Sequence, residues 1–315
     1  MTPSHSNLNN LRQYLSRYPN CHPDAFEYLV ARAFSQIFDL PFQSRDNEDN
    51  TVSHRVIWHG SAADEKNRII VKSPSGPDSI CYAYGFSILV EATLRKSSDQ
   101  WRNEFVESLK HYDAFLKNES ADKEDVFLTL IFPKLHRDTH TGFQQKAKEG
   151  HNIVLLESPH LAKIWDTCKT VFTARHLDLH RLFDDLAEKL REATSFDKFR
   201  RDLNKSISEW QKKVFNREKT VFFGLKSYEA MKRVGEKIVG MSGILGHLQG
   251  DRKVERYMRM LGGGDLKAYI KDGLVNERLA DSTKAHGEDM FCRISHVDFE
   301  ARGLRLIKAV KEINA

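Results

Sequence analysis

Apolar residues recur at two different spacings in the first half of the chain. In residues 24–38 they follow a helical period, with Phe26, Val30 and Phe34 on one stripe, which predicts an amphipathic helix. Short apolar segments that predict strands follow at 56–58, 68–71, 80–84, 86–93, 126–132 and 152–156. Further helices are expected at 100–117, at 142–149 and from Pro159 onward. Strands alternating with helices predict an α/β fold with a mixed sheet flanked by helices for residues 1–172.

The pattern becomes helical and highly charged after residue 172. Residues 176–239 predict helices with leucine and phenylalanine stripes, and shorter helices are expected at 228–238, 244–248 and 253–261. Leu274-Val275 is expected to pair with Met290–Ile294 as a hairpin around the polar loop 281–289, before a closing helix at 299–313.

Short helices, a two-stranded wing and a closing helix are typical of a winged helix. We therefore divide the chain into an α/β catalytic domain (1–172), a helical connector (173–225) and a winged-helix-like DNA-recognition domain (226–315).

Composition places the chain among ordinary globular proteins. Of its 315 residues, 40% are hydrophobic and 30% are charged. The beginning of the sequence lacks the pattern of a secretory signal, and no apolar run approaches the length of a membrane span. The four cysteines are far apart and form no CxxC pair, which argues against a zinc site and a disulfide framework. We expect a protein of the reducing cytoplasm with no membrane partner.

Positive charge is concentrated in the second half of the chain. The net charge is +5, and residues 176–275 carry 21 Lys and Arg against 15 Asp and Glu, while the other segments are nearly balanced. This excess suits a polyanion, and a solvated helical surface explains it equally well. The strongest basic group lies in the helix expected near 253–261, where four side chains could reach DNA phosphates or guanine edges: Arg252, Lys253, Arg256 and Arg259.

Two acidic residues stand at positions where neighbouring strands are expected to meet. Asp78 ends the sequence Gly76-Pro-Asp78, and Glu91 begins Glu91-Ala-Thr93 within an apolar strand. A carboxylate in a buried strand is costly unless it is paired or binds a metal. Two such carboxylates at one end of a sheet provide the hard oxygen ligands that Mg²⁺ prefers. The alternative is an acid at a strand end that is bonded to a loop amide.

Further polar residues follow at helical spacing. Gln100, Glu104 and His111 lie within about 40° of one another around a helix, so they share one face that could point toward the acids. Glu27 lies on the edge of the apolar stripe of the first helix. Each residue on its own is also consistent with an ordinary surface position.

The order of these residues resembles the cleavage domain of PD-(D/E)XK restriction endonucleases, in particular the AlwI-like branch of type IIS and strand-nicking enzymes. The resemblance covers residues 24–165 and is carried by Glu27, Gly-Pro-Asp78, Glu91-Ala-Thr-Leu, Gln100, Glu104 and Lys110-His111. It implies a nuclease fold with Mg²⁺ held by Asp78 and Glu91. It further implies that Glu104 and Glu27 assist, and that His111 lies beside the metal ligands or near the scissile phosphate.

One position departs from the wider family. Thr93 stands where most relatives have lysine, a gap that the AlwI-like branch shares. The role of the missing cation could pass to Glu104, Lys96 or His111, and the sequence leaves these alternatives open. The order of the domains also differs from that of some nicking relatives, in which the recognition domain comes first.

We therefore expect a Mg²⁺-dependent type II restriction endonuclease, IIS-like, that hydrolyses double-stranded DNA at or near a specific sequence. One active site per chain cuts one strand, so double-strand cleavage needs a homodimer, a partner nuclease subunit or sequential cuts. Two alternatives are a winged-helix DNA-binding protein with an inactive nuclease-like domain, and a nuclease of repair or of a mobile element.

Overall fold

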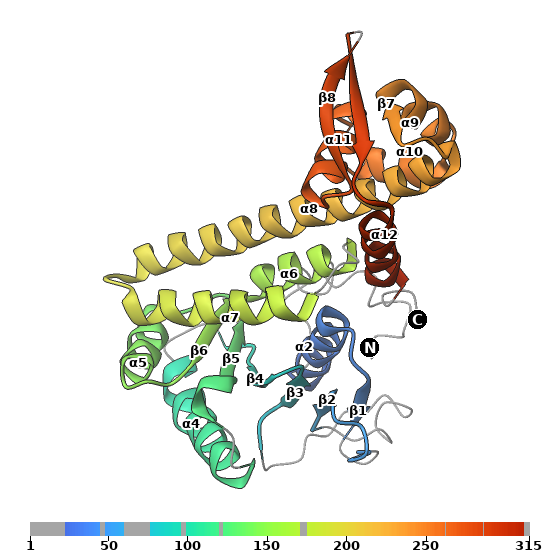
Figure 1. Ribbon diagram of the computed structural model, residues 1–315. Helices are drawn as coiled ribbons and strands as arrows, with labels where there is room; N and C mark the ends of the chain where they lie inside the picture. Colours follow the sequence, from blue (N-terminus) through green and yellow to red (C-terminus); the bar gives the residue numbers. More distant parts are fainter. Residues whose placement is uncertain are drawn as a thin grey trace. The chain divides into compact units, whose positions relative to one another are not determined.

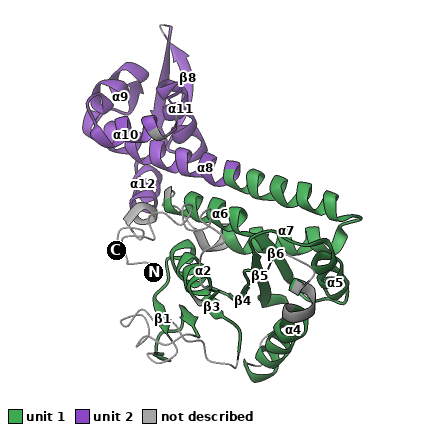
Figure 2. Cartoon of the chain, turned by 180° about the vertical axis from the view of Figure 1, so that it is seen from behind, with its two compact units in different colours: residues 1–170, 175–211 green, residues 171–174, 212–315 purple. Residues whose placement is uncertain are grey.

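The structure, a computed structural model, describes most of the chain. The described residues are 23–44, 48–59, 76–95, 99–119, 122–170, 175–261, 263–285 and 287–311. The chain divides into two compact units (Figure 2): unit 1 comprises Met1–Thr170 and Arg175–Gln211, and unit 2 comprises Val171–Ala174 and Lys212–Ala315. The strand expected at 68–71 lies outside the described residues.

Unit 1 contains a six-stranded mixed sheet with the strand order β1-β2-β3-β4-β5-β6 (Figure 1). Strand β3 is antiparallel to both of its neighbours, β2 and β4. Strand β1 is parallel to β2. Strands β4, β5 and β6 are parallel to one another. The strands are β1 (Phe42–Ser44), β2 (Arg55–Trp58), β3 (Ser79–Ala83), β4 (Phe86–Ala92), β5 (Val126–Phe132) and β6 (Ile153–Glu157). Every residue of β5 and β6 is buried, as expected for parallel strands covered on both faces.

Helices cover both faces of this sheet. They are α2 (Pro23–Phe38), α4 (Asp99–Glu119), α5 (Arg137–Lys148), α6 (Ser158–Thr170), α7 (Arg175–Glu192) and the first part of α8 (Phe196–Val234), with a 3₁₀ turn η3 (Lys123–Asp125). One face packs through aromatic rings on α2 and α7, where Phe38 lies 5.7 Å from Phe86 and Phe183 lies 5.8 Å from Phe127. On the other face, Phe115 of α4 lies 6.1 Å from Tyr82 of β3.

The mixed α/β architecture expected from the sequence is confirmed. The expected helix at 24–38 corresponds to α2, and the long apolar segments correspond to β3, β4, β5 and β6. The short strand β1 was not expected. Helix α5 begins at Arg137 rather than at Gly142, because the ring of His136 caps it by accepting a hydrogen bond from the N–H of Asp138.

Unit 2 contains helices and a three-stranded antiparallel sheet with the order β7-β9-β8. After the last part of α8 the elements are β7 (Ile238–Gly240), α9 (Met241–Leu248), α10 (Arg252–Met260), α11 (Leu266–Asn276), β8 (Ala280–Ala285), β9 (Glu288–Arg293) and α12 (His296–Lys311). Its core includes the fully buried side chains of Phe223, Ile270, Leu274, Phe291 and Phe299.

Two expectations for unit 2 are wrong. The helix expected at 228–238 is the end of α8, which stops at Val234 because Gly235 takes a left-handed φ of 78°, and Ile238 begins strand β7 instead. Leu274-Val275 belongs to helix α11, so it cannot pair with β9.

The partner of β9 is β8, with a shorter turn than the expected loop 281–289. Strand β8 has no apolar alternation, since four of its six residues are exposed, and so it gave no hydrophobic signal. Leu274 instead continues the buried stripe of α11 four residues after Ile270.

Helix α11 meets α8 at a pair of glycines. A Cβ atom on Gly273 would lie 2.5 Å from the backbone nitrogen of Gly224, closer than real Cβ contacts come. The two backbones therefore touch, and only glycine fits at this crossing.

Within the described residues, no helix is both long and apolar enough to cross a membrane. In the same part of the chain, Cys81, Cys168 and Cys292 form no disulfide.

Candidate active site

Asp78 and Glu91 stand opposite each other across neighbouring antiparallel strands. The register pairs Ser79 of β3 with Val90 of β4, and the next step brings Asp78 opposite Glu91. On its other side, the carbonyl of Asp78 accepts a hydrogen bond of 3.0 Å from the N–H of His59, which extends the pairing of β3 with β2 to this residue. Directly opposed residues have side chains on the same face of a sheet. Both acids therefore point to the face that α4 covers.

The carboxylate of Asp78 is held at the end of β4. Its Oδ2 accepts a hydrogen bond of 2.6 Å from the backbone N–H of Ala92, and the residue is only 3% exposed. A bond from a main-chain donor fixes the orientation of a buried carboxylate. Because the carboxylate is rigid, the same contact also fixes the position of its other oxygen, Oδ1.

Glu91 is paired with a histidine from α4. Its Oε1 lies 2.7 Å from Nδ1 of His111, and the exposed fractions of the two side chains are 7% and 21%. We assign the hydrogen to Nδ1, because a carboxylate can only accept. This contact stabilises a carboxylate that would otherwise be costly in a buried strand.

The two carboxylates match the chemistry of a magnesium site. Mg²⁺ is commonly held by one or two protein carboxylates, with water and substrate phosphate completing its coordination. Asp78 and Glu91 supply such a pair at the carboxyl end of β4. Among the described residues, no group of three or more His, Cys, Asp or Glu side chains could hold a metal ion.

The other two expected acids are less well placed or lie outside the described part. The backbone of Glu104 is in α4, but its side chain is not among the described ones. Glu27 is 8% exposed and lies on α2, which covers the opposite face of the sheet. The neighbouring Tyr28 packs 5.1 Å from Trp58, which pairs with Ser79, so the first turns of α2 lie at the same end of the sheet as Asp78. The side chain of Glu27 can therefore approach Asp78 and Glu91 only by passing around this end of the sheet.

The part of the chain that contains Asp78 and Glu91 is similar to known proteins. Residues 12–156 match the family model described as the AlwI restriction endonuclease. Residues 12–156, called the AlwI-family segment below, are therefore similar to AlwI restriction endonucleases. Among solved structures, the small subunit (R.BspD6I2) of the heterodimeric restriction endonuclease R.BspD6I matches 65% of this chain and 99% of its own, with 15% sequence identity and a TM-score of 0.46. No curated protein matches the chain.

By the resemblance described above, Thr93 occupies the position at which most relatives have a lysine. It is two residues after Glu91, on the same face, and is 9% exposed. Its backbone N–H donates to the carbonyl of Ile131 at 3.0 Å, and its hydroxyl accepts from the N–H of Arg95 at 3.3 Å. The threonine therefore supports the end of β4 and supplies no cation. Lys96, one candidate substitute, lies outside the described residues.

A further buried acid, just after the AlwI-family segment, was not expected from the sequence. Glu157 ends β6, and its Oε1 accepts from the backbone N–H of Leu135 at 3.2 Å while its Oε2 lies 3.3 Å from Arg200. Its own N–H donates to Nδ1 of His160, and burial holds the pKa of this imidazole below its ordinary value. The signal available was an acid directly after the apolar run of β6, the same pattern that singles out Glu91.

The four basic residues expected to contact DNA are all exposed on α10, outside the AlwI-family segment. The opposite side of α10 is anchored by Tyr257, whose ring stacks 4.2 Å from that of Phe222. Asp251 caps the helix with Oδ1 and pairs with Lys226 at 3.0 Å through Oδ2. The helix thus presents a firmly held basic surface formed by Arg252, Lys253, Arg256 and Arg259.

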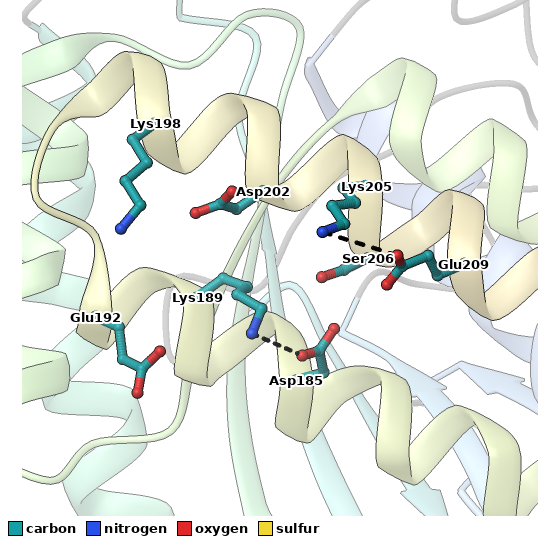
Figure 3. Close-up of a pocket in the computed structure, with 8 residues that line it drawn as sticks. All are labelled: Asp185, Lys189, Glu192, Lys198, Asp202, Lys205, Ser206 and Glu209. Atoms are coloured by element: carbon teal, nitrogen blue, oxygen red, sulfur yellow. Dashed lines mark ion pairs between the residues drawn. The ribbon is translucent and has the colours of Figure 1, made fainter.

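A polar pocket also lies between α7 and α8 (Figure 3). Asp185 pairs with Lys189 at 3.1 Å, and Glu209 lies 3.9 Å from Lys205. The remaining lining residues are Glu192, Lys198, Asp202 and Ser206. Acids and lysines occur in nearly equal numbers, so the pocket has no strong preference for an anion or a cation.

Proposed function

We propose that the chain is a Mg²⁺-dependent type II restriction endonuclease, IIS-like, with a PD-(D/E)XK site that hydrolyses double-stranded DNA at or near a specific sequence. One observation carries this proposal. Within the AlwI-family segment, Asp78 and Glu91 stand opposite each other on one face of the sheet, at the end of β4. Ligand sites in open α/β sheets characteristically lie at the carboxyl ends of the strands.

The residues have distinct roles in the proposed hydrolysis. Asp78 and Glu91 hold the metal ion, which when bound polarises the phosphodiester and lowers the pKa of the attacking water. Ala92 orients Asp78 through its N–H, and His111 orients Glu91 through Nδ1. Glu104 and Glu27 assist from the flanking helices. Cleavage leaves a 5′-phosphate and a 3′-hydroxyl.

Unit 2 supplies DNA recognition in this proposal. A helix, a short strand, further helices and a β8–β9 hairpin, with the sheet order β7-β9-β8, are typical of a winged helix. In that arrangement the helix directly before the hairpin is α11. The basic residues Arg252, Lys253, Arg256 and Arg259 lie instead on α10, where long cations are suited to DNA phosphates.

Each chain carries one such site and therefore cuts one strand at a time. Cleavage of both strands then requires a homodimer, a partner nuclease subunit or two sequential events. Nicked and linear products from a plasmid distinguish these cases.

The decisive experiment is cleavage of supercoiled plasmid by the purified chain with Mg²⁺ and with EDTA. We expect nicked or linear DNA with Mg²⁺ only. Asp78→Asn and Glu91→Gln should each reduce cleavage by at least about a thousandfold while DNA binding persists, because each removes a charge that holds the metal. Glu107→Gln is a matched control, since Glu107 is an exposed carboxylate on α4 that pairs with Lys110.

Either of two results contradicts the proposal. Full activity in the Asp78 or Glu91 variant would remove these residues from the site. A folded wild-type protein that binds DNA but never cleaves it with Mg²⁺ would favour a DNA-binding protein with an inactive nuclease-like domain.

A further inference from the structure

The side chain of Gln100, in the first turn of α4, is completely buried and uses both ends of its amide. Its Nε2 donates to the carbonyls of Arg95 at 2.6 Å and Lys134 at 2.7 Å. Its Oε1 accepts from the backbone N–H of His136 at 3.0 Å and from the hydroxyl of Thr139 at 3.2 Å. A carboxamide has two donor hydrogens and two acceptor positions, so all four are satisfied.

These bonds connect the segments that follow two neighbouring strands. Arg95 lies in the segment that leaves β4 directly after Thr93, and 134–136 lies between β5 and α5. Strands β4 and β5 are parallel, so both segments leave the sheet at the same edge. This is the edge at which Asp78 and Glu91 stand opposite each other.

The segment after β5 is also anchored from its other side. The N–H of Leu135 donates to Oε1 of Glu157 at 3.2 Å, and Glu157 is itself held by Arg200. Residues 134–136 thus have three consecutive backbone groups bound by buried side chains, two by Gln100 and one by Glu157. Gln100 therefore links this anchored segment to the residues that follow β4.

We propose that Gln100 is a positioning residue that locks the ends of β4 and β5 together and thereby fixes the geometry of the Asp78–Glu91 site. The inference rests on the proposed nuclease function and adds a residue that acts through others. Gln100 contacts neither the acids nor the metal site directly. Replacing Gln100 should therefore lower the cleavage rate, because a displacement of about 1 Å in an active site can reduce the rate by a factor of about 100.

The chemistry of the amide allows specific variants. Gln100→Glu keeps the acceptor of His136 and Thr139 but places a carboxylate against two carbonyl oxygens. Protonation of that carboxylate restores one donor, so the activity of Gln100→Glu relative to wild type should rise as the pH falls. Gln100→Leu removes the amide from all four groups at any pH. A contribution from packing alone predicts no such pH difference between the two variants.

The test compares these variants with Gln144→Glu and Gln144→Leu. The amide of Gln144, in the second half of α5, also donates to a backbone carbonyl, that of Ala193. Unlike the bonds of Gln100, this bond does not involve the residues that follow β4 and β5. Four quantities are measured for the full chain: the thermal midpoint, DNA affinity in EDTA, the single-turnover cleavage rate against Mg²⁺ concentration, and amide hydrogen exchange in 93–95 and 134–136.

We expect the Gln100 variants to bind DNA within about twofold of wild type and to cleave about 10- to 100-fold more slowly. They should also exchange hydrogen faster in both segments, whereas the Gln144 variants should not. Gln100 variants that cleave no more slowly than the Gln144 variants would overturn the proposal. If wild type itself does not cleave, the proposed function fails; unchanged exchange in both segments would then still refute the link, and faster exchange would still support it.

Discussion

The Nδ1 atom of His111 on α4 lies 2.7 Å from Oε1 of Glu91 on β4, and this contact joins a helix to the strand that carries the proposed metal ligand. The pair is buried on the side of the glutamate and partly open to solvent on the side of the histidine. The histidine therefore orients the carboxylate.

Replacing His111 should separate orientation from ring chemistry. His111→Ala removes the donor and should slow cleavage by about 10- to 100-fold, because the carboxylate loses the contact that orients it. His111→Asn places an amide N–H near the position of Nδ1 and should retain more activity. Single-turnover cleavage with saturating Mg²⁺ measures both. Equal losses in the two variants would show that the Nδ1 contact is not what matters.

Removing a positive charge from α10 should weaken DNA binding, and removing a negative charge should strengthen it. Arg256→Gln removes one phosphate contact and should weaken binding while reducing the salt slope, log Kd against log salt, by about one. Glu255→Gln, on the same exposed helix, removes a negative charge and should strengthen binding slightly. Titration at several salt concentrations with EDTA present provides the measurement. Affinities that do not differ between the two variants would exclude α10 from the DNA-binding surface.

His140 should make stability fall in mild acid. Burial, aided by the charge of Lys148, lowers the pKa of His140 to about 4, and its ring lies 4.8 Å from that of Phe199. Because the folded state resists protonation, the neutral ring contributes stability above its unfolded pKa. This contribution, about 1–2 kcal/mol after allowance for solvent screening, is lost as the pH falls from about 6.5 to 4.

His140→Leu should therefore flatten the dependence of the unfolding free energy on pH in this window. His247→Gln, which removes an exposed histidine on α9, is the control variant. Urea unfolding at a series of pH values decides the matter. A slope in His140→Leu that equals that of wild type would contradict the assignment.

The contact between Gly273 and Gly224 should not tolerate a side chain. Gly273→Ala forces a methyl group against backbone and should destabilise unit 2 by about 2–3 kcal/mol or more. Gly246→Ala, on α9 where a Cβ would meet nothing within 4 Å, should instead stabilise by about 0.5–1 kcal/mol. Thermal unfolding of the full chain provides the comparison. A neutral Gly273 variant would mean that the two helices can move apart freely.

The position of the two acids was accessible from the sequence because a hairpin connects them. Ala83 pairs with Phe86 across the turn at Tyr84-Gly85, where Gly85 has a φ of 84°. Asp78 and Glu91 lie equally far from that turn, so antiparallel pairing brings them opposite each other. The apolar runs of β4, β5 and β6 were equally readable, because buried parallel strands carry continuous hydrophobic sequence.

Other features depend on partners that no local pattern reveals. The bonds of Gln100 run mainly to backbone groups about 35 residues away, and the sequence indicated only that it shares a helix face with Glu104 and His111. Strand β8 is too exposed to show a hydrophobic period, and Gly273 is a poor helix former that α11 keeps because α8 passes so close. Tertiary contacts override local preference at both places.

The hydrogen bond from Ala92 to Asp78 also determines which variant is suited to test the proposed role of Asp78. Truncating the aspartate would leave a main-chain donor stranded inside the protein, and any loss of activity would then be mixed with loosening of the strand end. An isosteric asparagine keeps an acceptor for that donor while discarding the negative charge. Crystallisation of an uncleaved DNA complex should therefore begin from the asparagine form.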